Sequence, residues 1–249
     1  AQKSPAKMYE QLEPKGSKWH IHGKVSLIGC YLLMMYYTTV SGWMTSYFYK
    51  FATGTFESGM TSEQVSGVFS QLQSNPIEMV IWMAIITILG FLVCSRGIQK
   101  GIEKVSKVMM IALLVLILAL AVNSILLSGA GEGLKFYLVP YFEKVSEIGI
   151  GNIVSAAMNQ SFFTLSLGIA AMEIFGSYMS KDDTLPGESV KICALDTFVA
   201  IMAGLIIFPA CFSYGVEPDQ GPALIFITLP NVFVNMAGGR IWGTLFLLF

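Results

Sequence analysis

Long apolar stretches alternate with short polar segments along this chain. A helix of about 20 apolar residues is long enough to cross the hydrocarbon core of a bilayer. The pattern therefore predicts an all-α integral membrane protein, with residues 1–249 in a single transmembrane domain. The expected spans are 25–51, 76–94, 108–127, 151–180, 189–213 and 239–249, the last cut off at Phe249.

The span at 151–180 carries polar residues at its centre. Apolar residues flank the segment 159–168, which reads Asn-Gln-Ser-Phe-Phe-Thr-Leu-Ser-Leu-Gly. A simple lipid anchor would keep such polar residues away from the bilayer midplane. The pattern predicts a helix that breaks at 163–168 and turns its freed backbone groups on a ligand. A continuous helix, whose Ser and Thr bond to its own backbone or to a neighbouring helix, is the alternative.

The polar segments between the spans predict loops and an orientation. Residues 95–107 are strongly basic and are expected to face the cytoplasm, together with the basic residues 1–24. Within 1–24, His20 and His22 form a pair without a third ligand nearby, which favours a solvated loop over a metal site. Three further segments lie outside by this reasoning: a polar loop at 52–75, a surface helix at 134–145 and an outer cap loop at 214–238.

Composition narrows the class of protein. Hydrophobic residues make up 54% of the chain and charged residues 12%, about half the charge of a soluble domain. The net charge of −1 comes without a basic patch, so nucleic acid is not an expected partner. The four cysteines stand singly in apolar segments, and no Ser–His–Asp or metal constellation emerges, so an enzyme is not expected.

Several polar side chains lie inside the expected spans. Asp196 would cost a few kcal/mol there without a partner, which makes it a functional candidate. The alternatives are a position that water reaches or a protonated, helix-bonded acid. Glu173 is a second acid within a span, and its role stays open. The hydroxyls of Tyr36 and Tyr37 need a partner, either a neighbouring helix or a ligand.

Several motifs together resemble the neurotransmitter:sodium symporter family, and specifically its bacterial sodium-dependent amino-acid transporters. They lie at 36–37, 42–43, 101–104, 106–107, 160–168, 176–178, 180–182, 195–197, 203–204, 208–210, 215–218 and 238–239. The resemblance implies a fragment covering transmembrane helices 3 to early 8 of a twelve-helix, five-plus-five inverted-repeat transporter. The remaining helices would then be missing from this chain. It also implies a multi-pass protein of the cell inner (plasma) membrane.

The resemblance implies sodium-coupled symport of a small apolar or aromatic amino acid by alternating access. The residues alone leave open a membrane channel or receptor whose polar midplane residues line a pore. By the resemblance, Tyr37 would bond the substrate carboxylate and Phe163 would close over the substrate. Thr164 would bind sodium, and backbone around 163–166 would hold the amino group. The side-chain pocket would be lined by Leu33, Val40, Ser166, Leu167 and Ile169.

The resemblance also bears on the ions. Animal relatives have an Asn in place of Asp196 and a chloride-binding Ser in place of Ala200. A carboxylate at Asp196 can supply the negative charge that chloride supplies in those relatives. The expected cofactor is therefore sodium, held by Thr164 and Asp196, and chloride is not expected.

Overall fold

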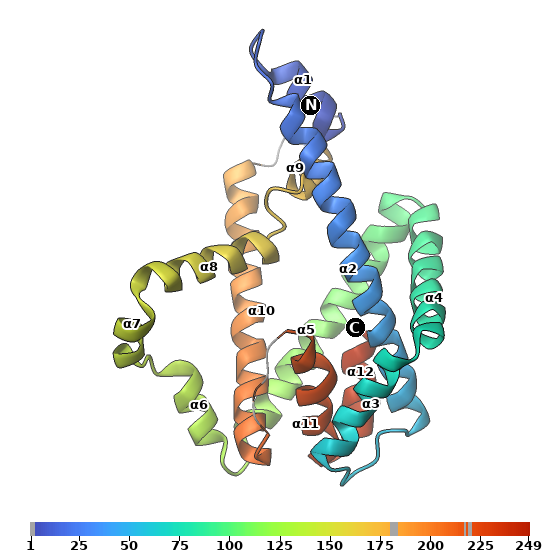
Figure 1. The fold of residues 1–249 in the computed structure, drawn as a ribbon, viewed down its shortest axis with the longest axis vertical. Coiled ribbons are helices and arrows are strands. Elements are labelled where there is room, and N and C mark those ends of the chain that lie inside the picture. The colour runs from blue at the N-terminus through green and yellow to red at the C-terminus, as the bar shows by residue number, and fades with distance from the viewer. Residues whose placement is uncertain (1–2, 180–183, 217, 219–220) are drawn as a thin grey trace. The chain divides into compact units, whose positions relative to one another are not determined.

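The computed structural model describes residues 3–179, 184–216, 218 and 221–249. All regular structure in these residues is helical, as expected (Figure 1). The α-helices are α1 (Pro5–Leu12), α2 (His20–Thr53), α3 (Ser62–Ser74), α4 (Pro76–Ser95), α5 (Lys104–Ile125), α6 (Ala130–Leu138), α7 (Phe142–Ile148), α8 (Ile150–Thr164), α9 (Ala171–Ser177), α10 (Leu185–Tyr214), α11 (Leu229–Asn235) and α12 (Gly239–Leu248). Two π-helical segments are η1 (Ile98–Glu103) and η2 (Leu224–Thr228).

Four helices in the described residues are long and apolar enough to cross a membrane. They are His20–Thr53, Pro76–Ser95, Gly101–Ile125 and Leu185–Tyr214. Each overlaps one of the expected spans and differs from it by a few residues at its ends. The stretch expected at 151–180 is instead divided between α8 and α9. The last residue of that expected span, 180, lies outside the described residues, as do the three that follow it.

Three segments expected to be loops, at 1–24, 52–75 and 214–238, contain helices. Residues 52–75 contain α3, whose N-terminus has a capping box. The Gln64 amide donates to Thr61 Oγ1 at 3.3 Å, and the Thr61 amide donates to Gln64 Oε1 at 2.9 Å. Val65, Phe69 and Leu72 form a buried stripe on α3, which the polar composition of the segment did not indicate. Residues 1–24 likewise contain α1 and the beginning of α2, so the prediction of a loop there was wrong.

The surface helix expected at 134–145 is two short helices. α6 ends at Leu138 and α7 begins at Phe142, with Pro140 between them. Proline has no amide hydrogen to donate and disfavours a helical residue before it, which explains the interruption. The next helix, α8, begins at Ile150 with Gly149 at the N-cap.

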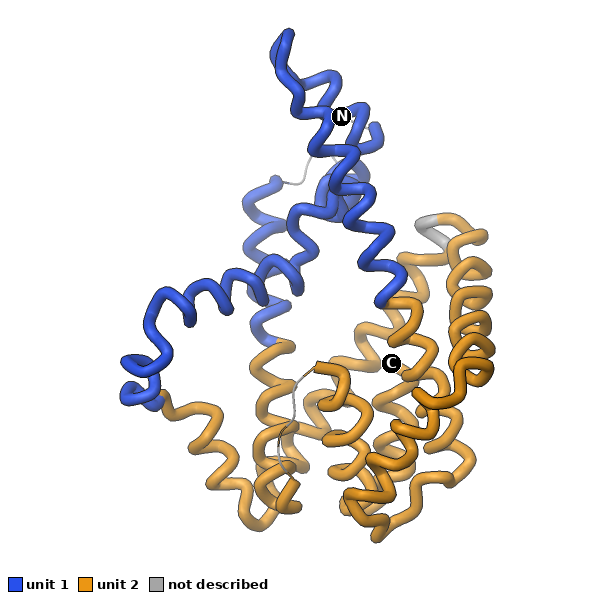
Figure 2. The backbone as a smooth tube through the Cα atoms, viewed as in Figure 1, with its two compact units in different colours: residues 1–36, 141–198 blue, residues 37–140, 199–249 orange. Residues whose placement is uncertain are grey.

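The chain divides into two compact units (Figure 2). Unit 1 comprises 1–36 and 141–198, and unit 2 comprises 37–140 and 199–249. Unit 2 has an aromatic core around Phe226, in the segment expected as a cap loop. Its ring centroid lies 5.1 Å from that of Tyr47, 5.2 Å from Phe69 and 5.6 Å from Trp43. The Tyr47 hydroxyl also donates to the Phe226 carbonyl at 3.0 Å, so η2 and α11 form part of this core.

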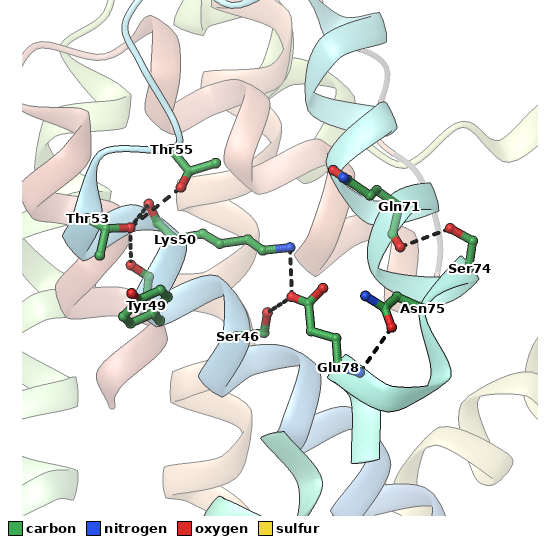
Figure 3. Close-up of polar contacts among 9 residues, drawn as sticks. All are labelled: Ser46, Tyr49, Lys50, Thr53, Thr55, Gln71, Ser74, Asn75 and Glu78. Atoms are coloured by element: carbon green, nitrogen blue, oxygen red, sulfur yellow. Dashed lines mark hydrogen bonds and ion pairs between the residues drawn. The ribbon is translucent and has the colours of Figure 1, made fainter. Parts of the chain in front are cut away.

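Within unit 2, α4 meets α2 along a narrow contact. At one end Lys50 Nζ lies 3.3 Å from Glu78 Oε1, and the Ser46 hydroxyl donates to the same oxygen at 3.4 Å (Figure 3). At its middle a Cβ on Gly42 would lie 2.9 Å from the Met83 backbone nitrogen. Close approach at a small residue, with polar contacts beside it, is how helices associate in lipid, where apolar burial provides little driving force.

Candidate functional site: a helix break beside a carboxylate

The helix that carries the polar segment breaks, as predicted. α8 ends at Thr164, α9 begins at Ala171, and the intervening residues form turns. The expected break at 163–168 is therefore confirmed, with its limits shifted to 165–170. The alternative of one continuous helix does not hold.

Left-handed backbone conformations produce the break. Ser166 has φ 52°, Gly168 has φ 81° and Ala170 has φ 64°. Such values cost a non-glycine residue about 1–2 kcal/mol, and strained residues of this kind gather at ligand sites. A broken helix also turns carbonyls at one end and amides at the other toward the gap, outside the regular helical ladder. These groups can bind the charged ends of a ligand and a cation without any charged side chain.

A carboxylate lies at the edge of this break. The Thr164 hydroxyl donates to Asp196 Oδ1 at 2.8 Å, which joins the last residue of α8 to α10 within unit 1. Closeness of these two residues had rested on the family resemblance alone. Hydroxyl, carbonyl and carboxylate oxygens are ligands that a hard cation such as sodium accepts. A cation there would offset the cost of an ionised carboxylate at membrane depth.

The remaining expected site residues lie on α8, in the break and on α2. Phe163 is in the last turn of α8, and Ser166, Leu167 and Ile169 lie in the break. Ile169 Cγ2 would be 3.6 Å from a Cβ on Gly29, so the break packs against α2 at that level. The remaining three site residues, Leu33, Tyr37 and Val40, follow Gly29 at helical spacing and so lie on the same face of α2. Tyr37 and Val40 belong to the stretch of α2 assigned to unit 2.

Glu173 has a partner that sequence reasoning missed. The Tyr9 hydroxyl donates to Glu173 Oε1 at 2.6 Å, joining α1 to α9 across 164 positions of sequence. This hydrogen bond, and burial beside it, raise the pKa of Tyr9, so the hydroxyl stays protonated and remains a donor. No local pattern links the two residues. Only the depth of Glu173 in an apolar segment marked it as a candidate.

This combination is a set of long apolar helices with an interrupted helix and a hydroxyl–carboxylate pair beside the break, the arrangement of secondary transporters. The family model described as "Sodium:neurotransmitter symporter family" matches residues 64–249. The chain belongs to this family. A transporter is therefore the supported class, in place of an enzyme.

Individual relatives agree with this assignment. An uncharacterised sodium-dependent transporter of Bacillus subtilis, YhdH, is 37% identical over 96% of this chain and 51% of its own length. One from Haemophilus influenzae is 31% identical over 92% of the chain and 50% of its own length. The crystal structure of MhsT in complex with L-phenylalanine matches all of the chain and 55% of its own, with 38% identity and a TM-score of 0.88. The chain thus spans about half the length of the relatives it matches.

Proposed function

We propose that the whole transporter, of which this chain spans about half, couples uptake of a small apolar or aromatic amino acid to sodium by alternating access. The observation that carries the proposal is the Thr164–Asp196 pair at the helix break. It places hard oxygen ligands and a negative charge beside the irregular backbone of the break. The relatives named as sodium-dependent transporters support the choice of ion.

The site residues divide between the ion and the amino acid. Thr164 and Asp196 bind sodium in this proposal, and the sodium in turn attracts the substrate carboxylate. The Tyr37 hydroxyl donates to that carboxylate, and Phe163 covers the substrate. An apolar side-chain pocket is formed by Leu33, Val40, Ser166, Leu167 and Ile169. The aromatic end of the proposed substrate range is supported by MhsT, which was crystallised with L-phenylalanine.

Chloride has no role in this proposal. An ionised Asp196 balances the charge of the bound sodium, and the position of a chloride-binding serine is taken by Ala200. The charges at the site are therefore balanced by one sodium ion and one carboxylate. Because the sodium ion also attracts the substrate carboxylate, the amino acid binds a complete site only after the ion has bound.

Uptake by the full-length transporter in proteoliposomes tests the proposal. Labelled phenylalanine or leucine should accumulate saturably with sodium outside, and replacing sodium with choline should abolish this. Replacing chloride with gluconate should have no effect. Asp196→Asn combined with Ala200→Ser should make uptake sensitive to chloride. Non-saturable flux would favour a pore, and an unmodified transporter that stops without chloride would remove the role given to Asp196.

The proposed orientation in the plasma membrane follows from the basic segment. Arg96, Lys104 and Lys107 place it in the cytoplasm, and the one span between them and Ser58, Pro76–Ser95, then places Ser58 outside. Two single-cysteine variants of a cysteine-free transporter, Lys107→Cys and Ser58→Cys, should react with an impermeant maleimide from opposite faces. Glu217 and Asp219, also expected outside, lie beyond the described residues. Labelling of both cysteines from one face would contradict the orientation.

A further inference from the structure

The N-terminal helix α1 is folded back firmly on the start of α2. A Cβ on Gly23 would lie 2.8 Å from Ala6 Cα, so the two helices pack backbone against backbone. The turn between them is closed by Glu13, whose Oε1 lies 2.8 Å from His20 Nδ1 and whose Oε2 accepts from the His20 amide at 3.1 Å. The Tyr9 ring meets the His22 ring edge-on at 5.2 Å. These contacts fix Tyr9 in place.

The half-helix α9, by contrast, is weakly held. None of its residues, all of which are described, is buried. At one end it continues into the break, where Ser166 and Ala170 have strained conformations. Within the described residues, its hydrogen bond from a side chain to another helix is the one between Tyr9 and Glu173. Elements with little burial and few tethers belong to the low-stability end of a structure.

Glu173 is placed at a cost that a purely structural residue would avoid. Its Oε1 accepts from Tyr9, whereas its Oε2 is buried with no hydrogen-bond partner in the described residues. A leucine or methionine there would pack without leaving a polar atom unpaired. A half-satisfied carboxylate provides one strong, directional and breakable contact, which is suited to an element that has two positions.

From these contacts we infer that the Tyr9–Glu173 hydrogen bond is a latch that holds α9 on α1 and closes the inner side of the helix break. Glu173 is a positioning residue for transport, and the inference rests on the proposed function. The basic N-terminal segment puts α1 on the cytoplasmic side. An amino acid bound at the break reaches that side when α9 leaves α1, which requires the bond to break. The bond therefore stabilises one of two positions and biases their populations.

The release of α9 from α1 can be measured by the accessibility of a cavity beside α9. It has a volume of about 680 Å³, and its lining includes Lys3, Leu27, Ser177 and Tyr178. In a cysteine-free full-length transporter, Ser177→Cys reports the opening of this region to an impermeant maleimide in inside-out vesicles with sodium and without substrate. Tyr9→Phe and Glu173→Met should each raise the labelling rate on the order of tenfold, as expected for loss of a hydrogen bond to a carboxylate.

The double variant should label no faster than either single variant, because both changes remove the same bond. Tyr47→Phe is the matched control, since it deletes a hydroxyl that bonds to the Phe226 carbonyl in unit 2. It should lower the unfolding temperature and leave the labelling rate unchanged. If Glu173→Met does not fold, Tyr9→Phe alone decides.

Labelling of Tyr9→Phe at the rate of its parent, or additive effects in the double variant, would overturn the latch. If the parent transporter shows sodium-dependent uptake but the parent and its variants label at the same rate, only the latch is contradicted. Absence of sodium-dependent uptake in the parent would instead remove the proposed function.

Discussion

The two units differ in how they are held together. All of the residues in the main buried cluster, including Tyr47, Phe69 and Phe226, belong to unit 2. Among the described residues of unit 1, Ala170 is the buried hydrophobic residue. Unit 1 instead relies on individual polar contacts, of which Thr164–Asp196 and Tyr9–Glu173 join helices distant in sequence.

This difference bears on how firmly each unit is held. Interlocking aromatic rings resist displacement, because every ring fills space that several neighbours share. Isolated hydrogen bonds can be exchanged for contacts to a ligand or an ion at little cost. Unit 1 thus holds the helix break and the Thr164–Asp196 pair, whereas unit 2 has the packing of a scaffold and also holds the expected site residues Tyr37 and Val40.

The largest expected effect comes from matched phenylalanine substitutions. Phe226 is fully buried and Phe163 is 50% exposed. Phe226→Ala should lower the free energy of unfolding by about 3–5 kcal/mol, because it leaves a cavity in the aromatic core. Phe163→Ala should change it far less and should weaken amino-acid binding. Thermal unfolding in detergent and equilibrium binding measure the two effects. Equal loss of stability in both variants would erase the distinction between the units.

A smaller effect is expected from removal of single hydroxyls. Thr164→Ala should weaken sodium binding, and Tyr37→Phe should weaken amino-acid binding, each by about 1–3 kcal/mol, since each removes a contact to a charged group. Thr87→Ala is the control, because the Thr87 hydroxyl bonds within α4 to the Met83 carbonyl. Sodium and amino-acid titrations followed by intrinsic fluorescence give the affinities. Affinities that match the parent in both site variants would return Thr164 and Tyr37 to a packing role.

The smallest effect compares two glycines with the same backbone strain. Gly168 in the break has φ 81° and Gly59 in unit 2 has φ 87°, and an added Cβ would meet no atom within 4 Å at either. Substitution by alanine should cost each variant about 1–2 kcal/mol of stability through the left-handed conformation. Only Gly168→Ala should also reduce amino-acid affinity. Unchanged binding by Gly168→Ala would mean that the break conformation does not matter for the ligand.

The sequence predicted the features that depend on local composition. Apolar runs located the long helices, and polar residues within an apolar run located the break. The helix α3 was missed because its polar surface outweighed Val65, Phe69 and Leu72, although Thr61 and Gln64 already marked its start. The pairing of Asp196 with Thr164 needed the family resemblance, and that of Glu173 with Tyr9 had no signal. Contacts between distant residues depend on how helices pack, which composition does not specify.

The contact between α2 and α4 also has a consequence for how this sequence can drift. At Gly42 the approach is to the backbone of Met83, so the fit does not depend on which side chain α4 presents there. None of the side chains of α4 is buried. Selection on this pair of helices therefore falls mainly on position 42 and on the polar contacts of Glu78. Trp82, whose ring centroid lies 5.3 Å from that of Tyr49, and Met83, whose Sδ accepts from the Thr39 hydroxyl, also contact α2. The remaining positions of α4 can exchange one apolar residue for another, as the bilayer around them changes, without altering the helix's place on α2.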